Sequence, residues 1–181
     1  MIKWTMIGTV AFALLILFEV RKCQFVKTSQ EKVQHFAGNP WFVVGTGMLL
    51  FACVMLGTVS GYAVGIRFWT GIAVLVAGLF AYGKVLAVAK PEGYIRDGKK
   101  QPVNRKGCYS WMRHPGVWTF LICAVGYGLV FEKAMLSVLW FAFLNGIYTW
   151  LQDRYFFPVY LEGYGEYQKE VPFLFPRKNK R

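Results

Sequence analysis

Residues 113–151 read RHPGVWTFLICAVGYGLVFEKAMLSVLWFAFLNGIYTWL and contain two apolar stretches, Gly116–Phe131 and Ala134–Leu151. Only Glu132 and Lys133 separate them. A connection this short joins neighbouring elements. We therefore expect the two stretches to form an antiparallel helical hairpin, in which the start of the first helix and the end of the second lie on the same side.

Arg113 and His114 stand directly before this hairpin, and Pro115 suits the first turn of its first helix. Ionisable groups at the edge of an apolar helix are costly there, and they mark a site when they are not simple flanking anchors. The functional prediction therefore begins at these three residues.

Three more apolar stretches, Trp4–Val20, Pro40–Val59 and Phe68–Ala89, precede the hairpin. Most of the five stretches approach the ~20 residues that cross a bilayer, although Gly116–Phe131 is short. The first has no basic segment beyond Lys3 and no small-residue cleavage site, so we expect a helix rather than a signal peptide. The chain is 56% hydrophobic and 17% charged. The sequence predicts an all-α, polytopic membrane protein with five transmembrane helices.

The distribution of lysine and arginine predicts the orientation of these helices. Of the 21 basic residues, four lie between the first two stretches, eight between Lys84 and Arg113, and six from Arg154 onward. Only Lys3, Arg67 and Lys133 fall on the other side. The positive-inside rule then places the N-terminus outside and the C-terminus in the cytoplasm of a plasma or inner membrane.

The same composition argues against two classes of function. The net charge of +12 follows from topology and from attraction to anionic lipid, and no soluble domain carries a basic stripe for nucleic acid. The four cysteines do not have metal-ligand spacing, so we expect no metal and only small apolar side chains there. They are Cys23, Cys53, Cys108 and Cys123.

We interpret residues 1–181 as one membrane domain with two unlike parts. Residues 1–90 would be three packing helices, with small residues repeating at every fourth position, as in Gly57, Gly61 and Gly65 and in Ala73, Ala77 and Ala81. Residues 91–181 hold the polar chemistry. They begin with a polar loop, Pro91 to Lys106, and the aromatic stretch Tyr155 to Tyr167 suits a segment lying on the cytoplasmic interface.

The expected hairpin brings polar side chains from its two ends to one depth at the cytoplasmic boundary. Such a site suits an amphiphilic cofactor that enters from the cytoplasm and an apolar substrate that enters from the bilayer. The other interpretation is that the arginines are interfacial anchors whose charged heads reach the headgroups. The residues concerned are Tyr109, Arg113, His114, Gln152, Asp153 and Arg154.

Two motifs in this half resemble those of the isoprenylcysteine carboxyl methyltransferase and phospholipid methyltransferase family. Gly107-Cys108-Tyr109-Ser110-Trp111-Met112-Arg113-His114-Pro115 resembles the family's Gly-x-Tyr-x-x-x-Arg-His-Pro motif. Tyr164-Gly165-Glu166-Tyr167-Gln168-Lys169-Glu170-Val171-Pro172 resembles its Tyr-x-x-Tyr-x-x-x-Val-Pro ending. The resemblance covers roughly residues 95–181, about half of the chain.

The resemblance implies an integral membrane enzyme that uses S-adenosylmethionine to methylate a lipophilic acceptor. In the family the matching positions line the cofactor pocket, and here they are Gln101, Val103, Asn104, Tyr109, His114, Pro115, Gly116 and Val117. We place catalysis at Arg113, Gln152 and Asp153 and expect Arg154 to face the substrate. A cation or an imidazole would hold the cofactor's carboxylate, and aromatic faces would suit its sulfonium.

The chain also departs from the family's pattern. An aromatic residue usually stands two positions after Arg-His-Pro, where this chain has Val117. The family's arginine and glutamate near the end of the last span fall here on Tyr148 and Gln152, with Asp153 next. Either a one-residue shift of register lets Asp153 and Arg154 take these roles, or the chemistry facing the substrate has changed.

Three functions follow from these residues. The first is methyl transfer to a carboxylate, or to an amine whose proton a base such as Asp153 would remove. The second is a nicotinamide-dependent membrane reductase, because membrane sterol reductases have a similar ending and Asp153-Arg154-Tyr155 fits their Asp-x-Tyr element. The third is a non-catalytic relative that only binds a ligand in the membrane.

Overall fold

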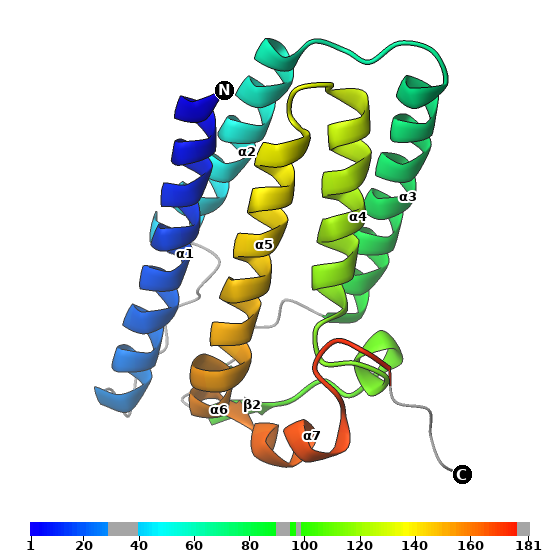
Figure 1. Ribbon diagram of the computed structural model, residues 1–181. Coiled ribbons are helices and arrows are strands. Elements are labelled where there is room, and N and C mark those ends of the chain that lie inside the picture. The colour runs from blue at the N-terminus through cyan, green and yellow to red at the C-terminus, as the bar shows by residue number, and fades with distance from the viewer. Residues whose placement is uncertain (29–39, 90–94, 97–98, 177–181) are drawn as a thin grey trace.

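The computed structural model describes residues 1–28, 40–89, 95–96 and 99–176. Long helices dominate the described residues (Figure 1). They are α1 (Ile2–Thr28), α2 (Pro40–Ser60), α3 (Ile66–Ala89), α4 (Pro115–Val130) and α5 (Met135–Leu151). Each of the five apolar stretches predicted from the sequence lies almost entirely within one of them, so the prediction of a mostly helical protein is confirmed.

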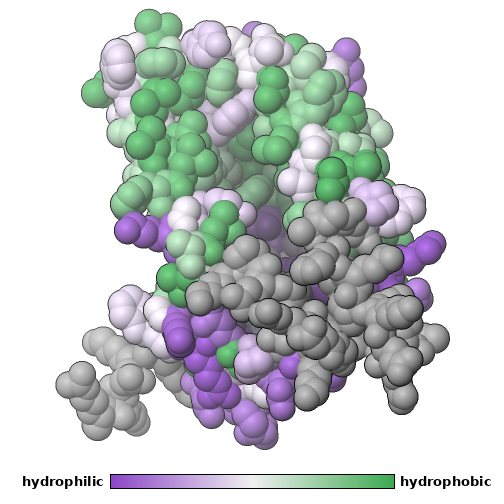
Figure 2. Space-filling view, turned by 180° about the vertical axis from the view of Figure 1, so that it is seen from behind, coloured by the Kyte–Doolittle hydropathy of each residue, from purple (hydrophilic) through white to green (hydrophobic). Residues whose placement is uncertain are grey.

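Three of these helices are long and apolar enough to cross a membrane, over Ile2–Gln24, Pro40–Ser60 and Ile66–Val88. Large apolar side chains such as Val54 and Phe80 are exposed on them. Figure 2 shows this apolar surface over most of the bundle and polar surface at one end. Contiguous exposed apolar surface of this kind marks an interaction surface, here one compatible with a bilayer.

The helices pack in a chain of neighbours, with α1 on α2, α3 on α4, and α4 on α5. Residues 61–65 and 131–134 form two connections that pair through the backbone N–H of Glu132 and the carbonyl of Gly61, 3.2 Å apart, at the upper end in Figure 1. We call this the turn end. The opposite end, which holds residues 99–114 and 152–176, is the pocket end.

Glycines bring α3 and α4 close together, but they are not the small residues that the sequence pattern indicated. A Cβ added to Gly126 would lie 2.5 Å from the backbone nitrogen of Leu75, and one added to Gly71 or Gly78 would meet atoms of α4 within 3.0 Å. Gly61 and Gly65 lie outside α2, with φ of 71° and 66°. Gly71 and Gly78 are seven residues apart, so a search for a four-residue repeat missed them.

The expectation of an all-α chain is wrong at the pocket end, where three short strands form a small sheet. Strands β1 (Ile95–Arg96) and β2 (Lys99–Pro102) pair antiparallel, and β2 pairs in parallel with β3 (Leu161–Glu162). β1 and β2 occupy part of the expected polar loop, of which residues 91–94 and 97–98 lie outside the described ranges, and β3 lies in the aromatic stretch. A two- to four-residue strand is too short to show an alternating pattern in the sequence.

The aromatic segment after α5 folds beneath the bundle and buries three of its four tyrosine rings, while Tyr155 is 54% exposed. It contains the π-helical turn η3 (Gln152–Phe156) and the short helices α6 (Phe157–Tyr160) and α7 (Tyr164–Glu170). Tyr160, Tyr164 and Tyr167 are at most 3% exposed. This segment forms the floor under α4 and α5 (Figure 1).

Candidate functional site

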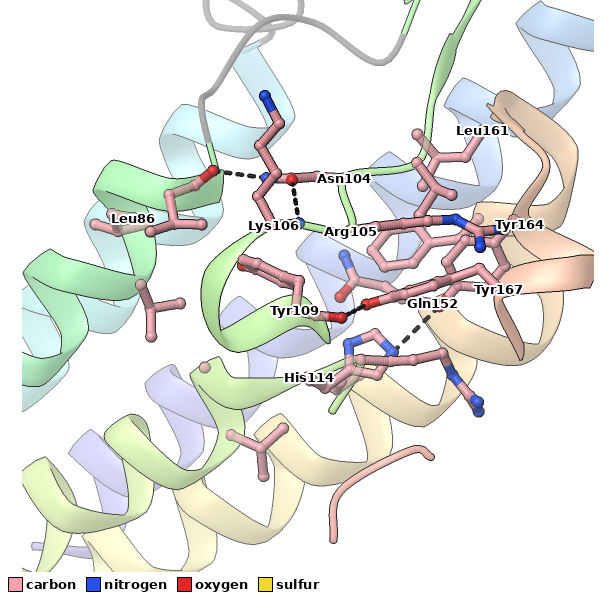
Figure 3. Close-up of a pocket in the computed structure, with 18 of the residues that line it drawn as sticks. Leu86, Asn104, Arg105, Lys106, Tyr109, His114, Gln152, Leu161, Tyr164 and Tyr167 are labelled. Atoms are coloured by element: carbon pink, nitrogen blue, oxygen red, sulfur yellow. Dashed lines mark hydrogen bonds between the residues drawn. The ribbon is translucent and has the colours of Figure 1, made fainter. Parts of the chain in front are cut away.

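A pocket of about 730 Å³ lies at the pocket end, between α3, α4 and α5 and above the segment after α5 (Figure 3). This volume falls within the range of small-molecule and cofactor sites. Most of its apolar lining comes from α3 and α4, and most of its polar side chains come from residues 104–114, from the end of α5 and from the segment that follows α5. The lining includes Tyr82, Leu86, Val103, Asn104, Arg105, Lys106, Tyr109, Arg113, His114, Gly116, Val117, Phe120, Asn145, Tyr148, Gln152, Tyr164 and Tyr167.

The segment before α4 is held against α3 and α7. Asn104 donates from Nδ2 to the carbonyl of Val88 at 2.6 Å, and its Oδ1 accepts the backbone N–H of Lys106 at 3.0 Å. The chain then turns at Gly107, whose φ of 58° suits glycine. The Tyr167 hydroxyl donates to the carbonyl of Tyr109 at 2.6 Å. Both of the motifs quoted above therefore supply one wall.

Arg113 and Asp153 form a buried, bidentate ion pair. The Nε of Arg113 lies 2.8 Å from Oδ1 of Asp153, and its Nη2 lies 3.0 Å from Oδ2. The side chains are 10% and 9% exposed. Nη1 donates to the carbonyls of Gln168, at 2.9 Å, and Val171. The Arg113 guanidinium is thus committed to protein groups.

His114 shares the same carboxylate. Its Nε2 lies 2.8 Å from Oδ1 of Asp153, and the Tyr164 hydroxyl donates to that oxygen at 2.6 Å. Because an ionised carboxylate only accepts hydrogen bonds, Nε2 carries the proton and Nδ1 of the neutral ring is an acceptor. The ring stacks on Phe157 and meets the edge of Phe173.

Arg113, His114, Asp153 and Tyr164 form one hydrogen-bonded unit. The shifted pKa values of His114, Asp153 and Tyr164 follow from burial and from shared hydrogen bonds. Burial lowers the pKa of His114 and outweighs the opposite effect of Asp153. Burial also opposes ionisation of Asp153, but hydrogen bonds from His114, Arg113 and Tyr164 outweigh it and hold the Asp153 pKa below its usual range. Burial, with the neighbouring Asp153, raises the pKa of Tyr164. At neutral pH the unit is one carboxylate, one guanidinium, a neutral imidazole and a phenol.

The C-terminal segment is bound to the start of α4. The backbone N–H of Arg113 donates to the carbonyl of Pro172 at 2.9 Å, and that of His114 donates to Phe173 at 3.2 Å. Trp118 Nε1 donates to the carbonyl of Leu174 at 2.8 Å. The two motifs that lie about 50 residues apart in the sequence are therefore in direct contact.

The π-helical turn η3 explains why the register of Gln152 and Asp153 was ambiguous in the sequence. A π-helical turn contains one more residue than an α-helical turn, and such turns are frequent at functional sites. Gln152 lines the pocket, while Asp153 is 6% exposed and lies behind His114. Both side chains therefore point inward, and the two alternatives drawn from the sequence do not exclude each other.

The site residues expected from the sequence have four different locations in the structure. Eight of them line the pocket: Val103, Asn104, Tyr109, Arg113, His114, Gly116, Val117 and Gln152. Pro115 and Asp153 are buried and, among the described residues, do not line it. Arg154 is exposed outside the pocket, contrary to the expectation that it faces substrate, because η3 turns it outward. The side chain of Gln101 lies outside the described part, and its backbone pairs with Leu161.

The sequence analysis missed Glu19, which reaches the site from α1. Its Oε1 accepts hydrogen bonds from Gln152 Nε2 at 2.8 Å and from the Tyr148 hydroxyl at 3.1 Å. Its Oε2 accepts one from the Tyr160 hydroxyl at 2.9 Å and lies 3.7 Å from Lys22 Nζ. Glu19 could have been found from the sequence, because an acidic residue at the end of an apolar stretch needs partners when it is buried.

The described residues do not contain a group of three His, Cys, Asp or Glu side chains that could hold a metal ion. All four cysteines are free. Searches of family models, of curated proteins and of solved structures found no match to this chain. The chemistry of the pocket therefore has to be argued from its own residues.

The lining combines groups for a ligand with both polar and apolar parts. Arg105 and Lys106 place cations at its polar side, beside the first turn of α4 at Gly116 and Val117. Burial raises the pKa of Tyr109 to about 12, so this side chain is a neutral hydroxyl at pH 7. Aromatic rings and aliphatic side chains of α3 and α4 form the remainder.

Proposed function

We propose that the chain crosses the membrane five times, with its N-terminus outside and its pocket end at the cytoplasmic interface. At 1.5 Å per residue, the 16 residues of α4 and the 17 of α5 extend ~24 Å and ~26 Å, less than the ~30 Å hydrocarbon core. Both helices continue into protein-covered segments at the pocket end. This continuation supports a complete crossing for each.

The topology is tested by labelling a single cysteine at the turn end. The four native cysteines are first replaced by alanine, and Lys133→Cys is then treated with a membrane-impermeant maleimide in intact cells. We expect labelling from outside, while a matched Lys106→Cys variant requires permeabilised cells. Labelling of Lys133→Cys only after permeabilisation would reverse the proposed orientation.

We propose that the protein transfers a methyl group from S-adenosylmethionine to a lipophilic acceptor at this interface. The observation that carries the proposal is the common location of the motif residues. Six of the eight cofactor positions implied by the family resemblance line one pocket, together with Arg113 and Gln152, and this pocket joins a polar wall to apolar helices. An amphiphilic cofactor and a lipid-borne acceptor need such a boundary.

The polar and aromatic groups of the pocket fit this cofactor, although Arg113 is not the cation that would hold its carboxylate. Arg113 is bound to Asp153 and to two carbonyls, so Lys106 and the first turn of α4 are the groups that would hold a carboxylate, together with Arg105, whose ion pair with Glu170 is exposed to solvent. Tyr109 supplies a neutral hydroxyl, and Tyr164 and Tyr167 supply aromatic faces for a sulfonium. When bound, S-adenosylmethionine supplies a methyl group whose bonding pair stays on sulfur as the acceptor's lone pair forms the new bond.

The contribution of the chain's own residues is alignment and exclusion of water. The Arg113–Asp153–His114 unit locks the start of α4 onto the C-terminal segment, which fixes the wall that Tyr109, His114 and Gly116 share. Neutral His114 presents Nδ1 as an acceptor. The apolar side chains of α3 and α4 keep the acceptor's side of the pocket dry.

The deciding experiment is calorimetric titration of the full chain in a nonionic detergent with S-adenosylhomocysteine and, separately, with NADPH. We expect saturable binding of S-adenosylhomocysteine alone. Binding of NADPH alone would replace the proposal with a membrane reductase. Binding of neither ligand by folded protein would leave the third function, a membrane protein that binds another ligand.

A further inference from the structure

Glu19 determines how the Gln152 amide is oriented. The carboxylate of Glu19 accepts hydrogen bonds from two hydroxyls and from Gln152, and lies beside the Lys22 ammonium. Its side chain is 3% exposed. An ionised carboxylate offers only acceptors, so the amide must turn its NH₂ group toward Glu19. The carbonyl oxygen Oε1 of Gln152 is then directed to the other side.

That other side is the pocket. Gln152 is one of its lining residues, and Figure 3 shows its side chain pointing in among Tyr109, His114 and Tyr164. Among the described residues, no hydrogen bond to the Gln152 carbonyl oxygen is found. A carbonyl oxygen in a largely apolar pocket favours a ligand that donates a hydrogen bond, because an unsatisfied polar group there is costly.

The charges near Gln152 favour the same kind of ligand. The nearest ionised group is the Glu19 carboxylate, on the far side of the amide, and its partner Lys22 is held against it and over the Tyr160 ring at 3.7 Å. Three cations line the pocket: Arg105 and Lys106 belong to the 102–109 segment, and the charge of Arg113 is paired with Asp153. An anionic headgroup at Gln152 would meet a carbonyl dipole of the wrong sign and a nearby carboxylate.

We infer that Glu19 of α1 is a positioning residue that fixes Gln152 as a hydrogen-bond acceptor and thereby selects an acceptor lipid with an amine headgroup over one with a carboxylate. This inference rests on the proposed function only in calling the ligand a methyl acceptor. The preference for an amine over a carboxylate follows from Glu19 and Gln152 alone. The α1 helix would then contribute to specificity, although the sequence analysis assigned it to packing alone.

The test uses dodecylamine and dodecanoate, two probes of equal chain length, titrated into the full chain in a nonionic detergent at fixed ionic strength. The measured quantity is the ratio of their affinities. We expect the wild-type protein to bind dodecylamine at least tenfold more tightly. Gln152→Met, which keeps the side-chain length and removes the carbonyl, should reduce this ratio to less than threefold.

Glu19→Gln should reduce the ratio as well, because a neutral amide no longer fixes the orientation of Gln152. If this variant fails to fold, Gln152→Met decides the test, since that variant leaves Glu19 with Tyr148, Tyr160 and Lys22. The matched control is Glu132→Gln, the same substitution at the exposed turn end, which should leave the ratio unchanged.

Three results would overturn the inference: tighter binding of dodecanoate by the wild type, a wild-type ratio in folded Gln152→Met, or an equal loss in Glu132→Gln. Titration with S-adenosylhomocysteine is performed on the same samples without either probe. If the wild-type protein does not bind S-adenosylhomocysteine but prefers dodecylamine, the methyl-transfer proposal is wrong and the amine preference remains. Normal binding with no amine preference would remove only the inference.

Discussion

The two ends of the helical bundle contain the same kind of ion pair in opposite surroundings. At the turn end, Arg67 lies 3.6 Å from Glu132, with side chains 40% and 58% exposed. At the pocket end, Arg113 lies 2.8 Å from Asp153, with side chains 10% and 9% exposed. Water screens the first pair and not the second. The comparison teaches that burial and extra hydrogen bonds, not the residue types, give an ion pair its structural importance.

The spacing of the helices also differs between the two ends. Toward the turn end, glycines let α3 and α4 approach to backbone contact. Toward the pocket end, α3, α4 and α5 surround a pocket of about 730 Å³ and large aromatic side chains occupy the floor. The tight end fixes the positions of the helices, and the open end uses that rigidity to hold a binding site.

Asp153→Ala should have the largest effect on stability. It leaves a buried guanidinium without its carboxylate, a change that costs about 3–5 kcal/mol in other proteins. The midpoint of thermal unfolding in detergent should fall accordingly, and S-adenosylhomocysteine binding should be lost with it. A loss below about 1 kcal/mol would show that the two ion pairs are alike and that the comparison fails.

His114→Ala should weaken S-adenosylhomocysteine binding by about 1–3 kcal/mol, since it removes a pocket-lining group and a hydrogen bond to a charged partner. Calorimetry on the folded variant measures the effect, with Glu162→Ala, an exposed residue of β3, as a control. An unchanged affinity would remove His114 from the site.

Acidification should destabilise the pocket end in two stages. The pKa of His114 is lowered from its ordinary value of 6.5, so below that pH the unfolded chain binds the extra proton and stability falls as pH falls. The Asp153 pKa is also lowered, from 3.8, and its contribution is present above that pH and lost below it. His114→Gln should abolish the first stage in a thermal-unfolding series from pH 8 to 5. A wild-type slope in that variant would contradict the assignment.

Gly126→Ala tests the tight end. Its new Cβ would lie 2.5 Å from the backbone of α3, so we expect a loss of about 1–3 kcal/mol from overpacking. The matched control is Gly83→Ala, where a Cβ would meet nothing within 4 Å and the helix should gain slightly from the better helix former. Equal melting temperatures for the two variants would contradict the close approach of α3 and α4.

Glu132→Ala should have the smallest effect, below about 1 kcal/mol, because its pair with Arg67 is exposed. Thermal unfolding measures it beside Asp153→Ala in the same detergent. The effect should shrink further at high salt. A loss as large as that of Asp153→Ala would show that the turn end depends on its ion pair.

Much of the fold could be predicted from the sequence because apolar stretches of 16 to 22 residues leave the backbone little choice but a helix. The five stretches and the short connection at Glu132 and Lys133 needed no tertiary information. The strands β1, β2 and β3 did, since each is too short to carry a pattern. The contact of Gly71 and Gly78 with α4 also depended on which helix lies opposite.

The candidate site divides in the same way. The motif around Arg113 and His114 pointed to the pocket end, and the expected hairpin placed Arg113 and Asp153 at the same end of the bundle. That the two form an ion pair was decided only by the tertiary structure. The π-helical turn that turns both Gln152 and Asp153 inward could not be foreseen, because it depends on the partners that each side chain finds. Arg154 was misplaced for the same reason.

The sequence by itself determined that the chain forms apolar helices and which short segment concentrates polar chemistry, because these properties depend on neighbouring residues along the chain. Only the tertiary structure decided that Glu19, 133 residues away in sequence from Gln152, shares a hydrogen bond with it. The physical reason is that a buried carboxylate takes whatever donors the packed helices bring within reach. No local pattern in the sequence records which helix that will be.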